Sequence, residues 1–322
     1  MKAPEFNRQL LAPRHWPAWI GVFIIFLMAR SPWWLQKRLG YFLGWLSWHL
    51  VGQRRSDTLV NLRLCFPELD EAQRLVMARD VFRQTGISIF EIANAWFRTP
   101  QSMQKRLIIV NPEYLADAHA QGRGVVLLGM HFSGMDLAGN LSSARFPVNT
   151  VYRPQNNPVF EYMVARQRAP IFEGQIDHDN MRGLLKALKA GKIVWYTPDQ
   201  DFGLYHGVMA PFFGVPAATI TTPARLARVN NSPVVMVHFR RNDDDRYELY
   251  FEQVPDFPSG DDVADATRIN LELEKMIRRA PTQYMWFHRR FKTRADGTPP
   301  PYVKKKRELR AEKEAAAAEK QP

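Results

Sequence analysis

Cysteine is nearly absent from this sequence: Cys65 is the only one in 322 residues. A single thiol excludes a disulfide framework and any zinc site built from several thiolates. No histidine lies near Cys65 in the sequence, so we interpret it as a helix-packing residue rather than a nucleophile. This cysteine usage fits a catalytic part on the reducing side of a membrane.

Long apolar runs are absent as well. An uncharged stretch lies between His15 and Arg30, and a second apolar block covers residues 39–51. Each is shorter than the ~20 apolar residues that a full membrane span normally needs, and neither ends in the small-residue cleavage site of a signal peptide. The two blocks predict either a short anchor that spans or lies in the membrane interface, or two buried core helices.

Aromatic and basic residues favour the membrane. Six of the nine tryptophans lie within the first 48 residues, as in an interfacial aromatic belt. Seven cationic residues flank the two apolar blocks, namely Arg8, Arg14, Arg30, Lys37, Arg38, Arg54 and Arg55. Because such cations bind phosphate headgroups, we predict that residues 1–55 form an N-terminal membrane anchor of interfacial helices.

Nucleotide-binding signatures and internal repeats are also lacking. The sequence contains no glycine-rich phosphate loop of the G-x-x-x-x-G-K type and no dinucleotide fingerprint. Its net charge of +12, from 44 basic and 32 acidic residues, nevertheless requires an anionic partner. Nucleic acid, anionic membrane lipid and phosphorylated substrates are the three classes that this charge leaves open.

The remaining pattern is typical of an α/β fold with a mixed sheet flanked by helices. Helical periodicity covers residues 56–66 and 68–97, and after Pro100 short apolar strands alternate with amphipathic helices. We predict strands at 124–130, 149–153, 169–174 and 192–197 and a hairpin of 232–240 with 246–254; the later helices are 157–168, 179–191, 221–231 and 269–281. The catalytic domain is assigned to residues 56–302, followed by a flexible charged tail at 303–322.

The stretch GMHFSGMD carries the clearest candidate chemistry. His131 directly follows a buried strand, and Asp136 lies five positions later, across a Ser-Gly turn. Reactive groups in α/β folds often lie at such strand ends. If Asp136 lies in the first turn of the next helix, its carboxylate can accept the proton of one imidazole nitrogen and leave the other as a base. We therefore predict a catalytic pair of His131 and Asp136.

The spacing alone is weak evidence, because eight histidines yield about one such match by chance. A second match, His238 with Asp243, lies in a strand and an Asp-rich turn, where turn chemistry explains the acid. Chain context therefore favours His131.

Other polar residues allow further sites. Asp199 and Asp201 follow another strand; a metal site with His206 and His178–Asp179 is an alternative, although its spacing matches no standard ligand pattern. We favour Asp199 as a buried partner for an arginine. The arginines Arg153, Arg166 and Arg168 are candidates for binding phosphate groups. The cluster HRRFKTR at 288–294 could face a membrane or a nucleic acid.

Several motifs together resemble the late acyltransferases of lipid A biosynthesis, in particular the lauroyl and palmitoleoyl transferases. They are RHWPAWIGV, NLRLCFPE, HFSGMD, VYRPQNNP, IVWYTPDQDFG, PFFGVPAAT and QYMWFHRRFKTRADGTPP, which extend from about residue 5 to 302. The order and spacing of these motifs make the resemblance specific.

The resemblance implies a glycerolipid-acyltransferase-like α/β domain behind an inner-membrane anchor, facing the cytoplasm. It implies transfer of an acyl group from acyl carrier protein to a hydroxyl of a 3-hydroxyacyl chain of Kdo2-lipid IVA, with no cofactor, no metal and no nucleic acid. Membrane phospholipid is the remaining partner. His131 would be the general base and Asp136 its orienting acid, while Arg168, Asp199 and Arg153 would bind substrate.

Two departures from related patterns bear on this expectation. The lipid A group commonly has Glu where this chain has Asp136, whereas the broader glycerolipid family has Asp. The E-G-T-R element of the glycerol-phosphate branch is absent, which argues against glycerol phosphate as acceptor. A lysophospholipid acyltransferase, a metal-dependent hydrolase and a non-catalytic membrane lipid-binding protein are the alternative functions.

Overall fold

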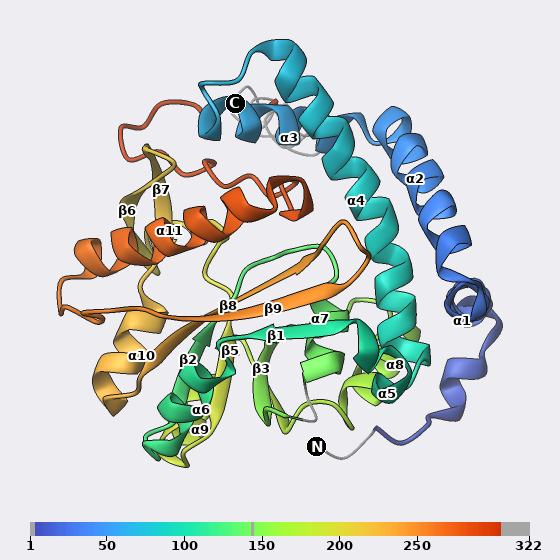
Figure 1. Ribbon diagram of the computed structural model, residues 1–322, viewed down its shortest axis with the longest axis horizontal. Helices are drawn as coiled ribbons and strands as arrows, with labels where there is room; N and C mark the ends of the chain where they lie inside the picture. The colour runs from blue at the N-terminus through green and yellow to red at the C-terminus, as the bar shows by residue number, and fades with distance from the viewer. Residues whose placement is uncertain (1–3, 143–144, 304–322) are drawn as a thin grey trace, which may run out of the picture.

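A seven-stranded sheet organises the part of the chain that this computed structural model describes, residues 4–142 and 145–303 (Figure 1). The strand order is β1-β9-β8-β2-β5-β3-β4, and neighbours run parallel except for β8 and β9. The predicted mixed α/β sheet is therefore confirmed. Its strands are β1 Leu107–Val110, β2 Val125–Leu128, β3 Val148–Tyr152, β4 Gly174–Asp177, β5 Ile193–Tyr196, β8 Val234–Arg241 and β9 Tyr247–Gln253.

Helices cover the sheet, and a separate hairpin of β6 (Gly207–Phe212) and β7 (Val215–Ile220) packs on the last of them. The helices are α1 Trp16–Arg30, α2 Trp33–Leu50, α3 Gly52–Cys65, α4 Glu71–Phe97, α5 Pro100–Met103, α6 Pro112–Ala120, α7 Met135–Ser142, α8 Pro158–Arg168, α9 Met181–Lys189, α10 Thr222–Asn230 and α11 Asp262–Arg279. The helices predicted over 157–168, 179–191 and 221–231 are confirmed as α8, α9 and α10. The last helix begins earlier than its predicted start because Asp261 caps it, accepting bonds from two backbone N–H groups.

One predicted strand is wrong. Residues 169–173 continue from α8 as a turn, because the carbonyl of Arg168 accepts bonds from the N–H groups of Ile171 and Phe172. The strand begins only at Gly174, as β4. The sequence prediction also lacked β1, α6 and the β6–β7 hairpin; β1 has only four residues, and prolines interrupt the apolar pattern of the hairpin.

The N-terminal helices are joined closely to the rest of the fold. In Figure 1, α2 lies along the outer side of α4. Their backbones cross so tightly that a Cβ on Gly86 would lie 2.0 Å from the carbonyl oxygen of Gly40, which explains the glycines at this crossing. The predicted division at residue 55 falls within α3, and residues 304–322, most of the predicted tail, lie outside the described residues.

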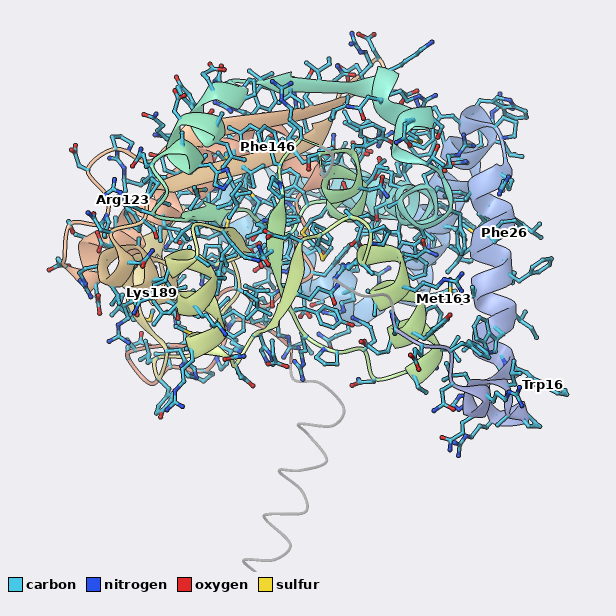
Figure 2. All side chains as sticks on the ribbon, turned by 90° about the horizontal axis from the view of Figure 1, so that it is seen from below. Trp16, Phe26, Arg123, Phe146, Met163 and Lys189 are labelled. Atoms are coloured by element: carbon cyan, nitrogen blue, oxygen red, sulfur yellow. The ribbon has the colours of Figure 1, made fainter. Side chains whose placement is uncertain are left out.

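A band of large apolar side chains on α1 and α2 faces outward in the described structure. Figure 2 shows Trp16 at the outer edge of the molecule, on α1. More than half of the surface of Trp16, Ile20, Phe23, Phe42 and Trp45 is exposed. Among the described residues, no helix combines the length and the apolar character that crossing a bilayer requires.

The rival histidine, His238, lies in the predicted hairpin, which is confirmed as β8 and β9. It is 1% exposed and packs edge-on against Phe132, with ring centroids 4.7 Å apart. Neither ring nitrogen has a hydrogen-bond partner, and burial lowers the pKa of His238 to about 3. His238 is thus a neutral core residue, whereas Asp243 is exposed in the turn.

We predict that His238→Leu raises the free energy of unfolding by about 1–3 kcal/mol, because it removes a buried polar group without a partner. The gain grows as the pH falls below ~6.5, where the unfolded histidine binds a proton that the folded one does not. Thermal unfolding at pH 7.5 and pH 5 measures both effects. The matched control is His206→Leu at an exposed histidine; equal stability of His238→Leu and wild type at both pH values would contradict this role.

Candidate active site

Two neighbouring strands place His131 beside Asp199. Strands β2 and β5 run parallel, with Leu128 paired to Tyr196. His131 and Asp199 each lie three residues beyond that pair, at the same edge of the sheet. The topology therefore brings together two residues that are 68 positions apart in the sequence.

Asp199 holds His131 with both carboxylate oxygens. The backbone N–H of His131 donates to Oδ2 at 2.9 Å, and the ring Nδ1 donates to Oδ1 at 2.7 Å. The prediction that Asp136 accepts a hydrogen bond from the imidazole is therefore wrong, because Asp199 does so. The prediction that Asp199 pairs with an arginine is wrong as well, since its partner is His131. With Nδ1 protonated, Nε2 is the nitrogen that can act as a base.

The electrostatics match this pairing. Burial would lower the pKa of His131, but the Asp199 carboxylate outweighs it and the pKa is raised. For Asp199, burial would raise the pKa, yet His131 lowers it to about 2. The side chain of Asp199 is fully buried and that of His131 is 21% exposed. The pair is thus an ionised, inaccessible acid behind an accessible imidazole, as in the orienting half of a catalytic triad.

Asp136 lies in the first turn of α7 and pairs with Arg168, at the end of α8, at 2.5 Å. Both side chains line the same polar pocket as His131, together with Thr150 and Thr197. Asp136 and Arg168, both predicted as site residues, thus line the same pocket as His131, but they pair with each other. Arg153 is exposed just beyond β3 and does not line this pocket.

Gln200 and His288 complete the surroundings of the base, and neither was predicted. The amide nitrogen of Gln200 lies 3.1 Å from Nε2 of both His131 and His288, and 3.4 Å from Nδ1 of His131. Because the amide is nearly as close to one ring nitrogen of His131 as to the other, it lies over the ring and does not occupy the Nε2 lone-pair direction. Burial, and then the charge of His131, lower the pKa of His288 to about 4.

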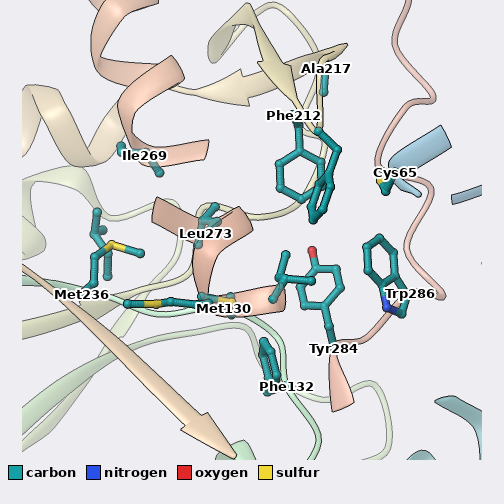
Figure 3. Close-up of a cluster of buried hydrophobic side chains, with 14 of the residues drawn as sticks. Cys65, Met130, Phe132, Phe212, Ala217, Met236, Ile269, Leu273, Tyr284 and Trp286 are labelled. Atoms are coloured by element: carbon teal, nitrogen blue, oxygen red, sulfur yellow. The ribbon is translucent and has the colours of Figure 1, made fainter. Parts of the chain in front are cut away.

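The segment after α11 fixes the backbone at His131. The N–H of Met285 donates to the carbonyl of His131 at 2.9 Å, and the N–H of Ser133 donates to the carbonyl of Gln283 at 2.8 Å. Between them, Phe132 and Tyr284 pair as an isolated antiparallel bridge and enter the core cluster shown in Figure 3. The loop that presents the base is therefore held by the hydrophobic core on one side and by Asp199 on the other.

The predicted alternative of a metal site is not assembled from Asp199 and Asp201. Both oxygens of Asp199 bind His131. Those of Asp201 accept bonds from the backbone N–H and hydroxyl of Thr293 and from the N–H of Gly203. Both carboxylates therefore already accept hydrogen bonds from the protein itself, and they do not form a metal site together.

An apolar cavity adjoins the polar pocket, and it shares Met135, Phe172 and Trp195 with the pocket around His131. The rest of its lining is almost entirely aliphatic and aromatic, including Phe146 and Phe251. The site thus combines an oriented base with a narrow apolar space that begins beside it.

Comparison with known proteins agrees with this chemistry. A family model described as bacterial lipid A biosynthesis acyltransferase matches residues 3–293. The lipid A biosynthesis lauroyltransferase of Escherichia coli (strain K12) is 36% identical over 302 residues, 93% of this chain and 99% of that protein. The palmitoleoyltransferase of the same organism is 34% identical over 93% of this chain and 98% of that protein.

A lipid A biosynthesis acyltransferase of Haemophilus influenzae is 35% identical over 93% of this chain and 97% of that protein. The matched regions contain the strands, the His131 loop and the Asp199 loop described above. The chain therefore belongs to the bacterial lipid A biosynthesis acyltransferase family and is an enzyme of acyl transfer.

Proposed function

We propose that this enzyme transfers a fatty acyl group from acyl carrier protein to a hydroxyl of a 3-hydroxyacyl chain of Kdo2-lipid IVA, on a glycerolipid-acyltransferase-like fold. One observation carries the proposal: His131, oriented by Asp199, lies in a polar pocket that adjoins an apolar cavity. A base beside such a cavity suits a reaction in which a hydroxyl attacks an acyl group whose chain is buried.

His131 is the proposed general base. Its Nε2 takes the proton of the acceptor hydroxyl as that oxygen attacks the thioester carbonyl, and the resulting imidazolium returns the proton to the departing thiolate. The C–O ester bond forms and the C–S bond breaks, so no co-reactant is needed. Asp199 stabilises the imidazolium, and backbone N–H groups at the start of α7 are the proposed donors to the oxyanion.

The remaining predicted site residues have proposed binding roles. Asp136 and Arg168 form an ion pair in the pocket, with side chains 24% and 21% exposed, so both are open to substrate. Arg168 is proposed to bind an oxygen of the donor or acceptor, and Asp136 to hold its guanidinium in place. Arg153, exposed at the end of β3, is proposed to bind an anionic group outside the pocket.

The proposed location is the cytoplasmic face of a bacterial inner membrane. The exposed apolar band of α1 and α2 fits the interfacial region of a bilayer, and arginines stack on its aromatic rings, such as Arg38 on Trp34 and Arg30 on Phe26. The net charge of +12 then has three anionic partners: phospholipid headgroups, the phosphates of the acceptor and an acidic carrier protein.

Acyl transfer by the purified chain tests the proposal. Acyl carrier protein loaded with one labelled acyl chain is offered with Kdo2-lipid IVA, a lysophospholipid or no acceptor, and the lipids are analysed by mass spectrometry. Acylated Kdo2-lipid IVA is the expected product. Acylation of the lysophospholipid alone would show that a lysophospholipid, and not Kdo2-lipid IVA, is the acceptor. Binding of both lipids without any transfer would show that the protein is a non-catalytic lipid-binding protein.

We predict that His131→Ala abolishes measurable transfer, because it removes the base that takes the proton of the hydroxyl. Asp199→Asn is expected to lower kcat on the order of 10²–10⁴-fold. Since Asp199 raises the pKa of His131, the acidic limb of the kcat/KM profile should also move to lower pH in that variant. A limb that stays in place would show that Asp199 does not act on the base.

The cavity is predicted to set acyl chain length. Phe146 lines it but not the polar pocket, so Phe146→Leu should lengthen the far part of the cavity and shift the preferred acyl chain to longer ones. Competition between carrier proteins with acyl chains of different length measures the preference. Phe90→Leu, at a buried site outside the cavity, is the control; an identical shift in both variants would contradict the assignment.

The apolar band is predicted to bind the membrane. Ile20→Glu with Phe23→Glu should lower the vesicle-bound fraction at least ~10-fold, because burial of each side chain contributes about 1.5–3 kcal/mol. Cosedimentation with phosphatidylglycerol–phosphatidylethanolamine vesicles measures it. Arg123→Gln with Lys189→Gln, on the side of the molecule away from α1 (Figure 2), lowers the net charge by the same amount and is the control; equal losses would point to net charge rather than the band.

A further inference from the structure

A second space reaches the site from the N-terminal helices. It is an open groove that shares no lining residue with the polar pocket or the apolar cavity. Ser47 and Val51 border it from the end of α2, and Phe82 and Thr85 border it from α4. Phe287 and His288 form its border on the segment after α11, so the groove is mostly apolar with polar groups at intervals.

One residue that lines this groove, His288, lies next to the catalytic base. The ring centroids of His288 and His131 are 5.3 Å apart, and the amide of Gln200 lies 3.1 Å from Nε2 of each. His288 and the amide of Gln200 therefore lie between this groove and Nε2 of His131.

The outer end of the groove joins the exposed apolar band. Leu50 is 72% exposed and Val51, which lines the groove, is 42% exposed at the end of α2. Arg54 lies at the same border, where it donates to the carbonyl of Phe287 and forms no ion pair with a carboxylate of the described chain. An apolar entrance beside an uncompensated cation suits a lipid with an anionic headgroup.

Direct transfer requires two long chains at one base. The acyl donor and the lipid acceptor must both lie at His131 when the hydroxyl attacks, and the structure offers two separate apolar spaces near it. We propose that the groove receives the hydroxyl-bearing acyl chain of the acceptor from the membrane side, while the donor chain fills the apolar cavity. This inference rests on the proposed function, which supplies the two substrates.

A reversible block of the groove tests the proposal. Because Cys65 is the only cysteine and is 1% exposed, a new cysteine on folded protein can be labelled selectively. Ser47→Cys places the thiol in the groove, and His49→Cys places it two residues along α2, on the border of a different groove. Each variant is assayed before labelling, after labelling with benzyl methanethiosulfonate, and after release by reductant, with labelling confirmed by mass spectrometry.

Labelling of Ser47→Cys should raise KM for Kdo2-lipid IVA at least ~10-fold, leave KM for the acyl donor within ~2-fold, and be reversed by reductant; labelled His49→Cys should behave like wild type. An unchanged acceptor KM in fully labelled Ser47→Cys overturns the inference, and so does a rise confined to the donor KM. If unlabelled Ser47→Cys and wild type both fail to acylate this acceptor, the proposed function itself fails.

Discussion

The contact between His131 and Asp199 is the constraint on which the rest of the site depends. One carboxylate fixes both the backbone and the ring of the same histidine, so the imidazole cannot turn without breaking a buried, charge-assisted hydrogen bond. The contact exists because β2 and β5 are parallel neighbours whose ends fall in register. The pairing of β2 with β5 thus places Asp199 where its carboxylate keeps the proton on Nδ1 of His131.

Three spaces lie around the contact between His131 and Asp199: a polar pocket, an apolar cavity and an open groove. The strand ends and α7 border the polar pocket, where Asp136 and Arg168 meet, and the apolar cavity beside it. The N-terminal helices and the segment after α11 form the open groove that His288 lines. Helices α2 and α4, which cross closely, each form part of the border of this groove.

Sequence reasoning predicted the fold class and the His131 loop with Asp136, because each depends on local pattern: a buried strand, a glycine turn, a helix start. Arg168, which also lines the polar pocket, was predicted from the family resemblance. It assigned the wrong partner to His131 because strand order is a long-range property. Asp199 was visible at a strand end, but nothing in the sequence pairs that strand with the one before His131. Gln200 and His288 lie within motifs quoted above, but nothing in those motifs assigns either residue to the base, and only the packing of distant segments brings them to it.

The central claim is that Asp199, and not Asp136, orients the base. The most direct measurement is the pKa of His131 by NMR titration of histidine-labelled protein, in wild type, Asp199→Asn and Asp136→Asn. We expect a raised pKa of His131 in wild type, a lower one in Asp199→Asn and little change in Asp136→Asn. A pKa that falls in Asp136→Asn and stays unchanged in Asp199→Asn would contradict it.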